Sequence, residues 1–303
     1  MVDDLVNYDL DELNRLSMEG NWMTNYKLPD GQFTKKMNPK RLTGKDYNKT
    51  KMLLSLDVRG KRVLDFGCSE GIYSFYLADN GADVVGVDLD EKRIKKAKFM
   101  KKILGYDNVS FICGSIFDRD LLNELPHFDL IIAWGFLHRV PDPFNALTII
   151  SSKCDTISLE WRAPAMLFPR SFSVALHLPT GNFEWKNLNQ KAIKGNKDSL
   201  NLKGEELAEF FRVSPGYVES ILNRQGFGFY NYNKIKNEIN FLNLSKSWIK
   251  FWLTLFKIQN KPFSWSPSCR IHLLAERNQG SLSFNSARLK DQNLADWDGR
   301  FIK

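Results

Sequence analysis

The chain has 303 residues, of which 43% are hydrophobic and 26% charged, so it can bury the core of one large or two small domains. Its 43 Lys and Arg against 35 Asp and Glu give a net charge of +8, which favours anionic ligands without selecting among nucleotides, nucleic acid and anionic membranes. Four widely spaced cysteines, an acidic N-terminus and no apolar run of about 18 residues argue against a disulfide framework, a signal peptide and a membrane span. We therefore expect a cytoplasmic protein.

The predicted elements begin after a polar stretch. Residues 1–50 show no long periodic pattern and are interpreted as a lead-in or cap. Beyond about residue 57, short apolar runs alternate with patterns of helical spacing. The sequence predicts strands at 61–66, 82–87, 109–113, 129–134, 156–160, 228–232 and 270–276, and helices at 72–79, 91–104, 143–152 and 214–222. Because helices separate the first strands, they indicate βαβ units and a parallel sheet.

Two insertions, at about 162–212 and 233–268, interrupt this alternation. We expect one main domain over residues 51–277 that contains both insertions, followed by a polar tail over 278–303. The apolar stripe Trp248–Phe256 in the second insertion fits a lid, a dimer contact or an interfacial membrane helix, and a lid is the simplest of these interpretations.

The most informative stretch is VLDFGCSEG, residues 63–71, in which a buried strand turns into a helix. Gly67 and Gly71 permit a sharp turn and a close approach of the backbone to a ligand, and the N–H groups of the following helix favour a carboxylate or phosphate. Asp88 ends the next strand 17 residues after Gly71, where Rossmann-type folds place an acid against ribose hydroxyls. Together they indicate a nucleoside cofactor; the alternatives are a tight structural turn and a helix cap.

The spacing within this loop favours one kind of cofactor over another. Nicotinamide enzymes use a G-x-G-x-x-G loop for a pyrophosphate and need no acid two residues before its first glycine. Here the pattern is D-x-G-x-x-x-G. Asp65 therefore suits a cofactor with a positively charged ammonium group, as in S-adenosylmethionine.

These motifs resemble class I S-adenosylmethionine-dependent methyltransferases of the small-molecule type. VLDFGCSEG is similar to their motif I, VVGVDLD to the acidic motif of their second strand, and FICGSIFD to the loop that flanks adenine. FDLIIAWGFLHRVPDPFNAL resembles their fourth-strand motif, and FFRVSPGYVESILNRQGF the helix and strand that follow. The resemblance implies an α/β, Rossmann-like seven-stranded sheet, parallel except for one reversed last strand, with helices on both faces, an N-terminal cap and two insertions.

The resemblance also implies site residues. Those expected to bind the cofactor are Asp65, Gly67, Cys68, Ser69, Gly71, Asp88, Leu89, Ser115, Ile116 and Trp134. His138 and Glu160, at the ends of the fourth and fifth strands, are the candidates for catalysis, with a structural histidine and an ion-paired or acceptor-orienting glutamate as alternatives. No metal is expected. The chain departs from the family pattern in having Ser69 for a glycine, Ser115 for an acid and Arg139 for a second histidine.

A narrower resemblance involves GNWMTNYKLPDGQFT, residues 20–34, which is similar to a segment of the bacterial tRNA wobble-uridine carboxymethyltransferase group. The shared features are Trp22, residues 28–31 and Thr34. In such an enzyme the acceptor would be tRNA, and the basic residues between Lys35 and Lys45 would bind its phosphates.

The main prediction is methyl transfer from S-adenosylmethionine to a small molecule, with oxygen favoured over nitrogen as the acceptor atom. The alternatives are tRNA modification, a nicotinamide-dependent oxidoreductase and a cofactor-binding protein without catalysis. The modest charge argues against tRNA, DNA is not expected as a partner, and the basic run Lys92–Lys102 is interpreted as a solvated helix face. The sequence leaves open the acceptor, the oligomeric state and whether the donor is ordinary or carboxylated S-adenosylmethionine.

Overall fold

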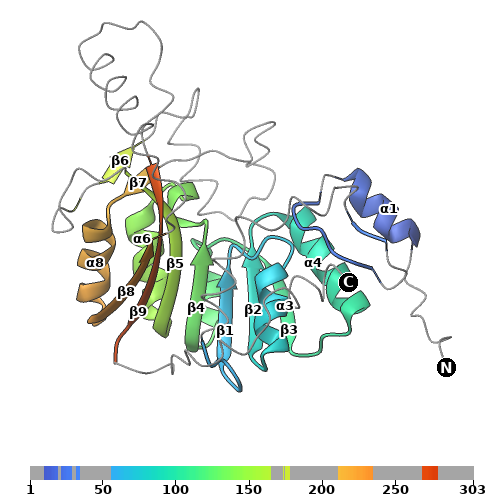
Figure 1. The fold of residues 1–303 in the computed structure, drawn as a ribbon, viewed down its shortest axis with the longest axis horizontal. Helices are drawn as coiled ribbons and strands as arrows, with labels where there is room; N and C mark the ends of the chain where they lie inside the picture. Colours follow the sequence, from blue (N-terminus) through green and yellow to red (C-terminus); the bar gives the residue numbers. More distant parts are fainter. Residues whose placement is uncertain are drawn as a thin grey trace, which may run out of the picture. The chain divides into compact units, whose positions relative to one another are not determined.

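The computed structural model describes residues 10–19, 22–28, 32–34, 56–164, 173, 175–177, 211–234 and 268–278. Seven of its strands form one sheet in the order β3-β2-β1-β4-β5-β9-β8 (Figure 1). They are β1 (Arg62–Phe66), β2 (Asp83–Asp88), β3 (Val109–Cys113), β4 (Phe128–Trp134), β5 (Cys154–Pro164), β8 (Phe229–Lys234) and β9 (Ser268–Glu276). β9 is antiparallel to both β5 and β8, whereas β1 with β2, β2 with β3 and β4 with β5 are parallel pairs. The predicted fold class, a seven-stranded sheet with one reversed strand, is confirmed.

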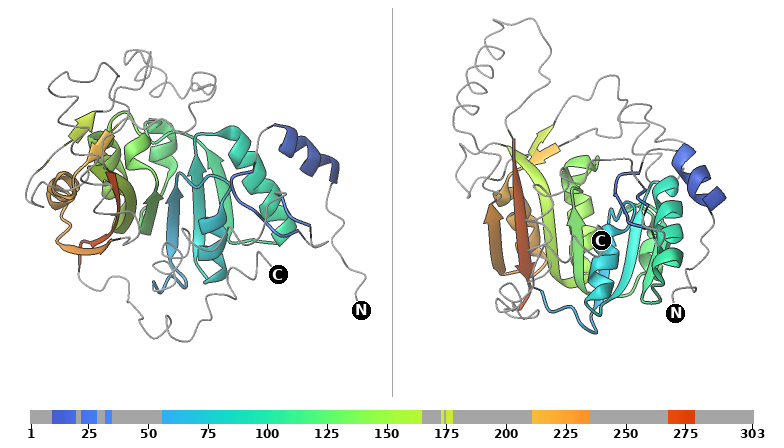
Figure 2. Two further views of the ribbon diagram at one scale, coloured as in Figure 1. Left: turned by 45° about the horizontal axis from the view of Figure 1, so that its top comes forward. Right: turned by 45° about the vertical axis from the view of Figure 1, so that its right-hand side comes forward.

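The described residues divide into two compact units, one that ends at Gly114 and one that begins at Ser115. The first unit contains β1, β2 and β3 together with α1 (Leu10–Met18), α3 (Ile72–Asp79) and α4 (Glu91–Leu104). α4 begins where the Asp90 carboxylate accepts the N–H groups of Lys92 and Arg93, and it ends at Gly105 in the left-handed conformation. α1 lies beside α4 (Figure 2).

An aromatic ring fills the space that two glycines leave in the first unit. Gly86 is paired with Phe111 across β2 and β3, and a Cβ atom on Gly86 would lie only 2.6 Å from Cδ1 of that ring. A Cβ atom on Gly71 would lie 2.5 Å from Cζ of the same ring. Phe75 packs edge-on against Phe111 with the ring centroids 5.4 Å apart. The glycines therefore allow the ring to pack directly beneath the loop that follows β1.

The second unit is built around β4 and β5. β4 is almost continuously buried, as is typical of a parallel strand covered on both faces. Besides β8 and β9, the unit contains α5 (Arg119–Glu124), the short 3₁₀ helix η2 (Leu137–Arg139), α6 (Pro143–Ser152), α8 (Pro215–Arg224) and a separate pair of strands, β6 (Ala175–His177) and β7 (Phe211–Val213). α6 and α8 each begin with proline after a capping side chain, Asp142 and Ser214 respectively.

The structure adds elements that the sequence did not predict. The helix α1 lies in the stretch that shows no long periodic pattern and is interpreted as a lead-in or cap, and its buried residues are only Leu13 and Leu16, too few for a clear periodic signal. α5, η2, β6 and β7 have three to six residues each. β5 is longer than the predicted 156–160 because β9 pairs with it as far as Pro164.

Several predictions fall outside the described residues. They concern the basic residues Lys35–Lys45, the stripe Trp248–Phe256, most of both insertions and nearly all of the tail over 278–303. Within the described ranges, no helix has the length and apolar character needed to cross a bilayer. The cysteines Cys68, Cys113 and Cys154 carry free thiols.

Candidate functional site

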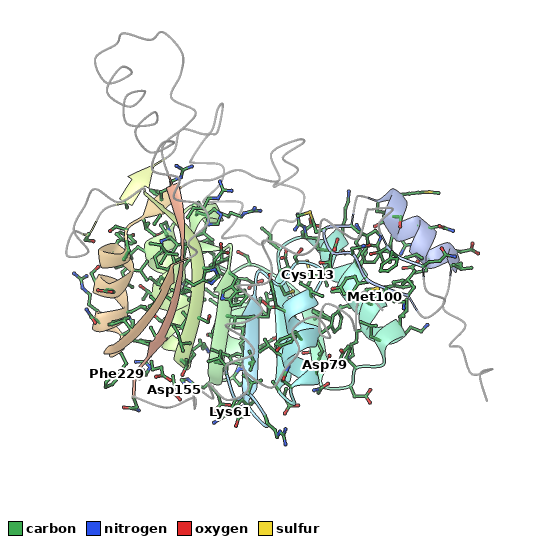
Figure 3. The ribbon with its side chains drawn as sticks, viewed as in Figure 1. Lys61, Asp79, Met100, Cys113, Asp155 and Phe229 are labelled. Atoms are coloured by element: carbon green, nitrogen blue, oxygen red, sulfur yellow. The ribbon has the colours of Figure 1, made fainter. Side chains whose placement is uncertain are left out.

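The loop Gly67–Gly71 follows β1 at the carboxyl end of the strands of the first unit. Two residues labelled in Figure 3 mark the ends of these strands. Lys61 directly precedes β1 at one end, and Cys113 is the last residue of β3 at the other. Three loop residues have a positive φ, namely Gly67 at 80°, Ser69 at 53° and Gly71 at 85°. A serine in this region costs of order 1 kcal/mol more than a glycine, so the departure at Ser69 needs support from its neighbours.

Asp88, the last residue of β2, supplies part of that support. Its Oδ2 accepts the backbone N–H of Ser69 at 2.8 Å, and its Oδ1 accepts that of Asp90 at 2.9 Å. Arg93 of α4 donates from Nη1 to Ser69 Oγ at 3.0 Å and from Nε to Asp90 Oδ2 at 3.1 Å. Burial raises the pKa of Asp88, while the N–H of Asp90, the positive charge of Arg93 and the N–H of Ser69 lower it. Leu89, between the two acids, is half-buried.

Asp65 lies on β1 two residues before Gly67 and is buried. Its Oδ2 accepts a hydrogen bond from Ser74 Oγ of α3 at 2.6 Å. Burial raises its pKa to about 7, with the hydrogen bond from Ser74 opposing and the charge of Asp88 adding to the shift. Burial likewise raises the pKa of the Cys68 thiol well above its ordinary value, which makes it a poor nucleophile.

The loop leads directly into α3, an eight-residue helix whose first residue is Ile72. Gly71 occupies the position before it and has no side chain with which to cap the first turn. The partial positive charge at this helix start lies next to the left-handed residues of the loop. The loop and the helix start together suit a small anionic group such as the carboxylate of an amino acid.

Glu70, to which the sequence reasoning gave no role, connects the loop to the N-terminal residues. Its Oε1 accepts the backbone N–H of Met23 at 2.8 Å, and its Oε2 accepts that of Thr24 at 2.6 Å. Lys96 of α4 lies with Nζ 3.8 Å from Glu70 Oε1, and both side chains are buried. Lys96 is therefore an exception to the predicted solvated face, and burial lowers the pKa of its ammonium group, with the charge of Glu70 opposing the shift.

In the second unit, β4, β5 and β9 place three side chains next to one another in one row across the sheet. Two of them, Trp134 and Glu160, were predicted, and the third, His272, was not. Trp134 pairs with Glu160, and Glu160 pairs with His272. Paired residues of neighbouring strands project from the same face. The ring contact between Trp134 and His272, at 5.5 Å between centroids, and the hydrogen bond from Trp134 Nε1 to Ser158 Oγ at 3.0 Å agree with this arrangement. Glu160 and His272 are both buried, so the row places a carboxyl and an imidazole side by side inside the protein.

The other predicted residues of the second unit lie outside the strands. His138 is buried in η2, which follows β4 and packs against β5 and β7. The N–H of Gly135, between β4 and η2, donates to the Glu160 carbonyl oxygen at 2.8 Å. Ser115 Oγ accepts the N–H of Phe117 at 3.1 Å, so this hydroxyl stabilises the turn that contains Ile116.

The structure thus gathers seven predicted residues at one end of the first unit and five in the second. Those of the first unit are Asp65, Gly67, Cys68, Ser69, Gly71, Asp88 and Leu89, and those of the second are Ser115, Ile116, Trp134, His138 and Glu160. Glu70, Arg93 and His272 were not predicted from the sequence. An acid inside a glycine loop was a visible signal for Glu70, whereas His272 is paired with Glu160 only through the register of β9. No group of three or more potential metal ligands occurs in the described part of the chain.

Comparison with known proteins agrees with this geometry. Residues 57–155, which include β1 to β4, match a protein family described as a methyltransferase domain. The match covers both acidic residues, Asp65 and Asp88, and the loop between β1 and α3. Together with the seven-stranded sheet, this match supports the predicted resemblance to the class I S-adenosylmethionine-dependent methyltransferases.

Curated relatives carry the name ubiquinone biosynthesis O-methyltransferase. The protein from Idiomarina loihiensis is 36% identical over 141 residues, which are 45% of this chain and 53% of the relative. The protein from Nitrosospira multiformis is 33% identical over 146 residues, which are 47% of this chain and 55% of the relative. The chain therefore spans about half the length of the curated relatives that it matches.

Solved structures share the fold at low sequence identity. The N-terminal domain of EvdMO1, crystallised with S-adenosylhomocysteine (SAH) and D-fucose, has a TM-score of 0.57 and 14% identity, over 89% of this chain and 97% of that one. The [4+2]-cyclase SpnF has a TM-score of 0.50 and 13% identity, over 91% of this chain and 94% of that one. Because one neighbour is named for a cyclisation, the shared fold does not by itself define a reaction.

Proposed function

We propose that the chain is an S-adenosylmethionine-dependent methyltransferase that methylates a hydroxyl group of a small molecule. The observation that carries the proposal is the arrangement at the carboxyl end of β1 and β2. There a left-handed loop, a helix start without a side-chain cap and two acidic side chains lie together. The domain match over residues 57–155 and the O-methyltransferase names of the relatives support it.

The residues of the first unit fit the chemical groups of S-adenosylmethionine. Asp88 is half-buried at the end of β2, and its carboxylate is suited to accept hydrogen bonds from the ribose hydroxyls. Asp65 suits the ammonium group, because a nearby positive charge favours the ionised carboxylate over the protonated one that burial favours. The backbone of the loop Gly67–Gly71 is suited to face the amino-acid tail, whose carboxylate suits the start of α3.

Methylation of a hydroxyl needs few functional groups from the protein. S-adenosylmethionine supplies a methyl group on a sulfonium, which is a good leaving group, so most of the rate enhancement comes from alignment of the reactants. The proton of the hydroxyl must also leave. We assign its removal to His138, because an imidazole is well suited to accept a proton near neutral pH, and assign to Glu160 a role in orienting the acceptor.

Two alternatives from the sequence are less well supported. Modification of tRNA would be carried by Lys35–Lys45, which lie outside the described residues, and the relatives are named for a small-molecule reaction. A nicotinamide-dependent oxidoreductase would not explain a match to a methyltransferase domain. The cytoplasmic location stays a prediction.

The proposal is tested with the purified chain in two steps. Native mass spectrometry should first detect a retained adenosyl ligand, which would also distinguish ordinary from carboxylated S-adenosylmethionine by mass. The chain should then release S-adenosylhomocysteine when it is incubated with S-adenosylmethionine and fractions of a metabolite extract. Ligand binding without turnover in every fraction would instead support a cofactor-binding protein, and the absence of any adenosyl ligand would contradict the proposal.

A further inference from the structure

We propose that the N-terminal strap, defined as residues 22–28 and 32–34, holds the cofactor-binding loop in its active conformation and that Glu70 is the positioning residue between them. The strap would thereby compensate for the serine that replaces a glycine at Ser69. This inference rests on the proposed function, because it assigns the strap a contribution to S-adenosylmethionine binding.

Glu70 is attached to the strap through both carboxylate oxygens. Each oxygen accepts one backbone N–H, from Met23 at 2.8 Å and from Thr24 at 2.6 Å. Glu70 is 1% exposed, and the buried ammonium group of Lys96 lies 3.8 Å from it. A buried carboxylate that receives two N–H donors and a counter-charge is held in one position, since loss of any one of them would remove part of the compensation of its charge.

Tyr26 makes a second connection, to the backbone of the loop. Its hydroxyl donates to the Glu70 carbonyl oxygen at 2.6 Å. The ring is fully buried and packs edge-on against Phe75 of α3, with centroids 6.1 Å apart, and against Trp22, at 6.2 Å. The strap therefore holds Glu70, which lies between Ser69 and Gly71, through both its side chain and its backbone carbonyl group.

The strap has internal structure of its own. Lys27 and Phe33 form a β-bridge, and the N–H of Leu28 donates to the Gln32 carbonyl oxygen at 2.8 Å. Thr34 Oγ1 accepts the N–H of Tyr26 at 2.9 Å and donates to the Thr24 carbonyl oxygen at 3.1 Å. These contacts order the strap, whose Met23 and Thr24 N–H groups donate to Glu70.

Lys96 connects the same cluster to α4. Besides its approach to Glu70, its ammonium group lies 5.0 Å from the centroid of the Trp22 ring, a cation–π distance. The Trp22 indole N–H in turn donates to Ser17 Oγ of α1 at 2.9 Å. The contacts to Glu70 are thus continuous with the packing of the first unit.

Ser69 is the residue for which this support matters. Its φ of 53° is a conformation that glycine adopts readily and serine does not. Such a conformation persists where neighbouring contacts determine it. Asp88 and Arg93 hold Ser69 itself, and the strap holds the next residue, Glu70. Loosening the strap should therefore release the loop in a chain with serine at this position and much less in a chain with glycine.

The test is a double-mutant cycle between the strap and the loop, with SAH as the calorimetric probe. Tyr26→Phe removes one hydrogen bond to the loop and should raise the Kd for SAH about fivefold to tenfold. In the Ser69→Gly background, the same Tyr26→Phe change should raise the Kd less than about twofold, since glycine needs no support. Glu70→Gln should behave like Tyr26→Phe, because its amide group replaces one acceptor by a donor that faces a backbone N–H.

Tyr106→Phe is the matched control. It also removes a tyrosine hydroxyl from a ring that stacks on Phe75, but this hydroxyl donates to Asp79 at 2.7 Å and not to the loop. If Tyr26→Phe changes the Kd no more than Tyr106→Phe does, or by the same factor in both Ser69 backgrounds, the proposal is overturned. If Tyr26→Phe prevents folding, Glu70→Gln gives the same comparison.

Hydrogen exchange of the ligand-free chain separates this proposal from the proposed function. The amides of Ser69 and Gly71 donate to Asp88 and to the Cys68 carbonyl oxygen, so they should exchange slowly in the wild type and faster after Tyr26→Phe or Glu70→Gln. A wild-type chain that does not bind SAH would contradict the proposed function alone. Unchanged exchange at these amides would contradict the role of the strap alone.

Discussion

At the scale of single residues, the candidate site depends on acids whose surroundings differ. Asp88 is half-buried and holds the loop through the Ser69 N–H, whereas Asp65 is buried beneath the loop and held by Ser74. Glu70 is the most restrained of the three, because it receives two backbone N–H groups and faces Lys96. The three carboxyl groups therefore have separate roles within one short segment of the first unit.

Replacement of Asp88 should weaken cofactor binding strongly. Asp88→Ala removes both the acceptor proposed for the ribose hydroxyls and the acceptor that holds Ser69. The Kd for SAH, measured by calorimetry, should rise at least about tenfold. The control is Asp83→Ala at the exposed, amino end of the same strand, which should leave the Kd unchanged. An Asp88→Ala chain with wild-type affinity would remove Asp88 from the site.

Asp65 should make the stability of the ligand-free chain depend on pH. Its pKa is about 7 in the folded chain against an ordinary value of 3.8, so between these values the folded state holds a proton that the unfolded state has released. This group therefore lowers the free energy of unfolding as the pH rises, by up to about 1.4 kcal/mol per pH unit, with little further change above pH 7.

The test for Asp65 is chemical denaturation of the wild type and of Asp65→Asn at several pH values from about 4.5 to about 8. The amide still accepts the Ser74 hydrogen bond but does not ionise. The variant should therefore gain stability relative to the wild type as the pH rises, while its affinity for S-adenosylmethionine falls. A stability difference that is constant across this pH range would show that Asp65 ionises normally.

His138 should affect turnover more than binding. We expect His138→Gln to lower kcat at least about tenfold with a verified hydroxyl acceptor, because proton removal is slowed, and to leave the Kd for SAH within about twofold. His127→Gln is the control, since His127 belongs to the same unit but is exposed and paired with Asp155. Equal kcat values for the two variants would make His138 structural and direct attention to His272 beside Glu160.

At the scale of elements, local signals in the sequence predicted most of the main sheet. The bounds of α3, α4, β3 and α6 agree with the predicted ranges, and the caps Asp90 and Asp142 mark the starts of α4 and α6. The residues missed in the site depend on long-range contacts. Glu70 accepts hydrogen bonds from residues of the strap, and His272 lies opposite Glu160 because β9 pairs with β5 in this register. Neither contact is visible in a local sequence pattern.

The packing of Phe111 beneath the loop gives a prediction at this scale. Gly86→Ala should destabilise the chain by about 1–3 kcal/mol, because the added Cβ would meet the Phe111 ring and would lie 3.1 Å from Cys68 Sγ. Gly228→Ala is the control, since a Cβ there meets nothing within 4 Å and its backbone is not left-handed. Thermal unfolding checks both variants. A Gly86→Ala midpoint no lower than that of Gly228→Ala would mean that the ring has room to move.

At the scale of the whole molecule, the sequence match to a domain family covers fewer residues than the similarity of fold does. The methyltransferase domain match covers residues 57–155, in which the cofactor motifs lie, while the likeness of fold extends over 89% of the chain. The two insertions, at about 162–212 and 233–268, which we expect to form the acceptor pocket, lie mostly outside the described residues. This division explains why the chemistry of the donor could be inferred in residue detail, and that of the acceptor only as a class.

The most direct measurement is a crystal structure of the full chain grown with S-adenosylhomocysteine. We expect the ribose hydroxyls to lie within hydrogen-bonding distance of the Asp88 carboxylate and the amino-acid tail to lie against the loop Gly67–Gly71. Ligand density elsewhere on the chain, or a loop region that excludes the ligand at saturating concentration, would contradict it.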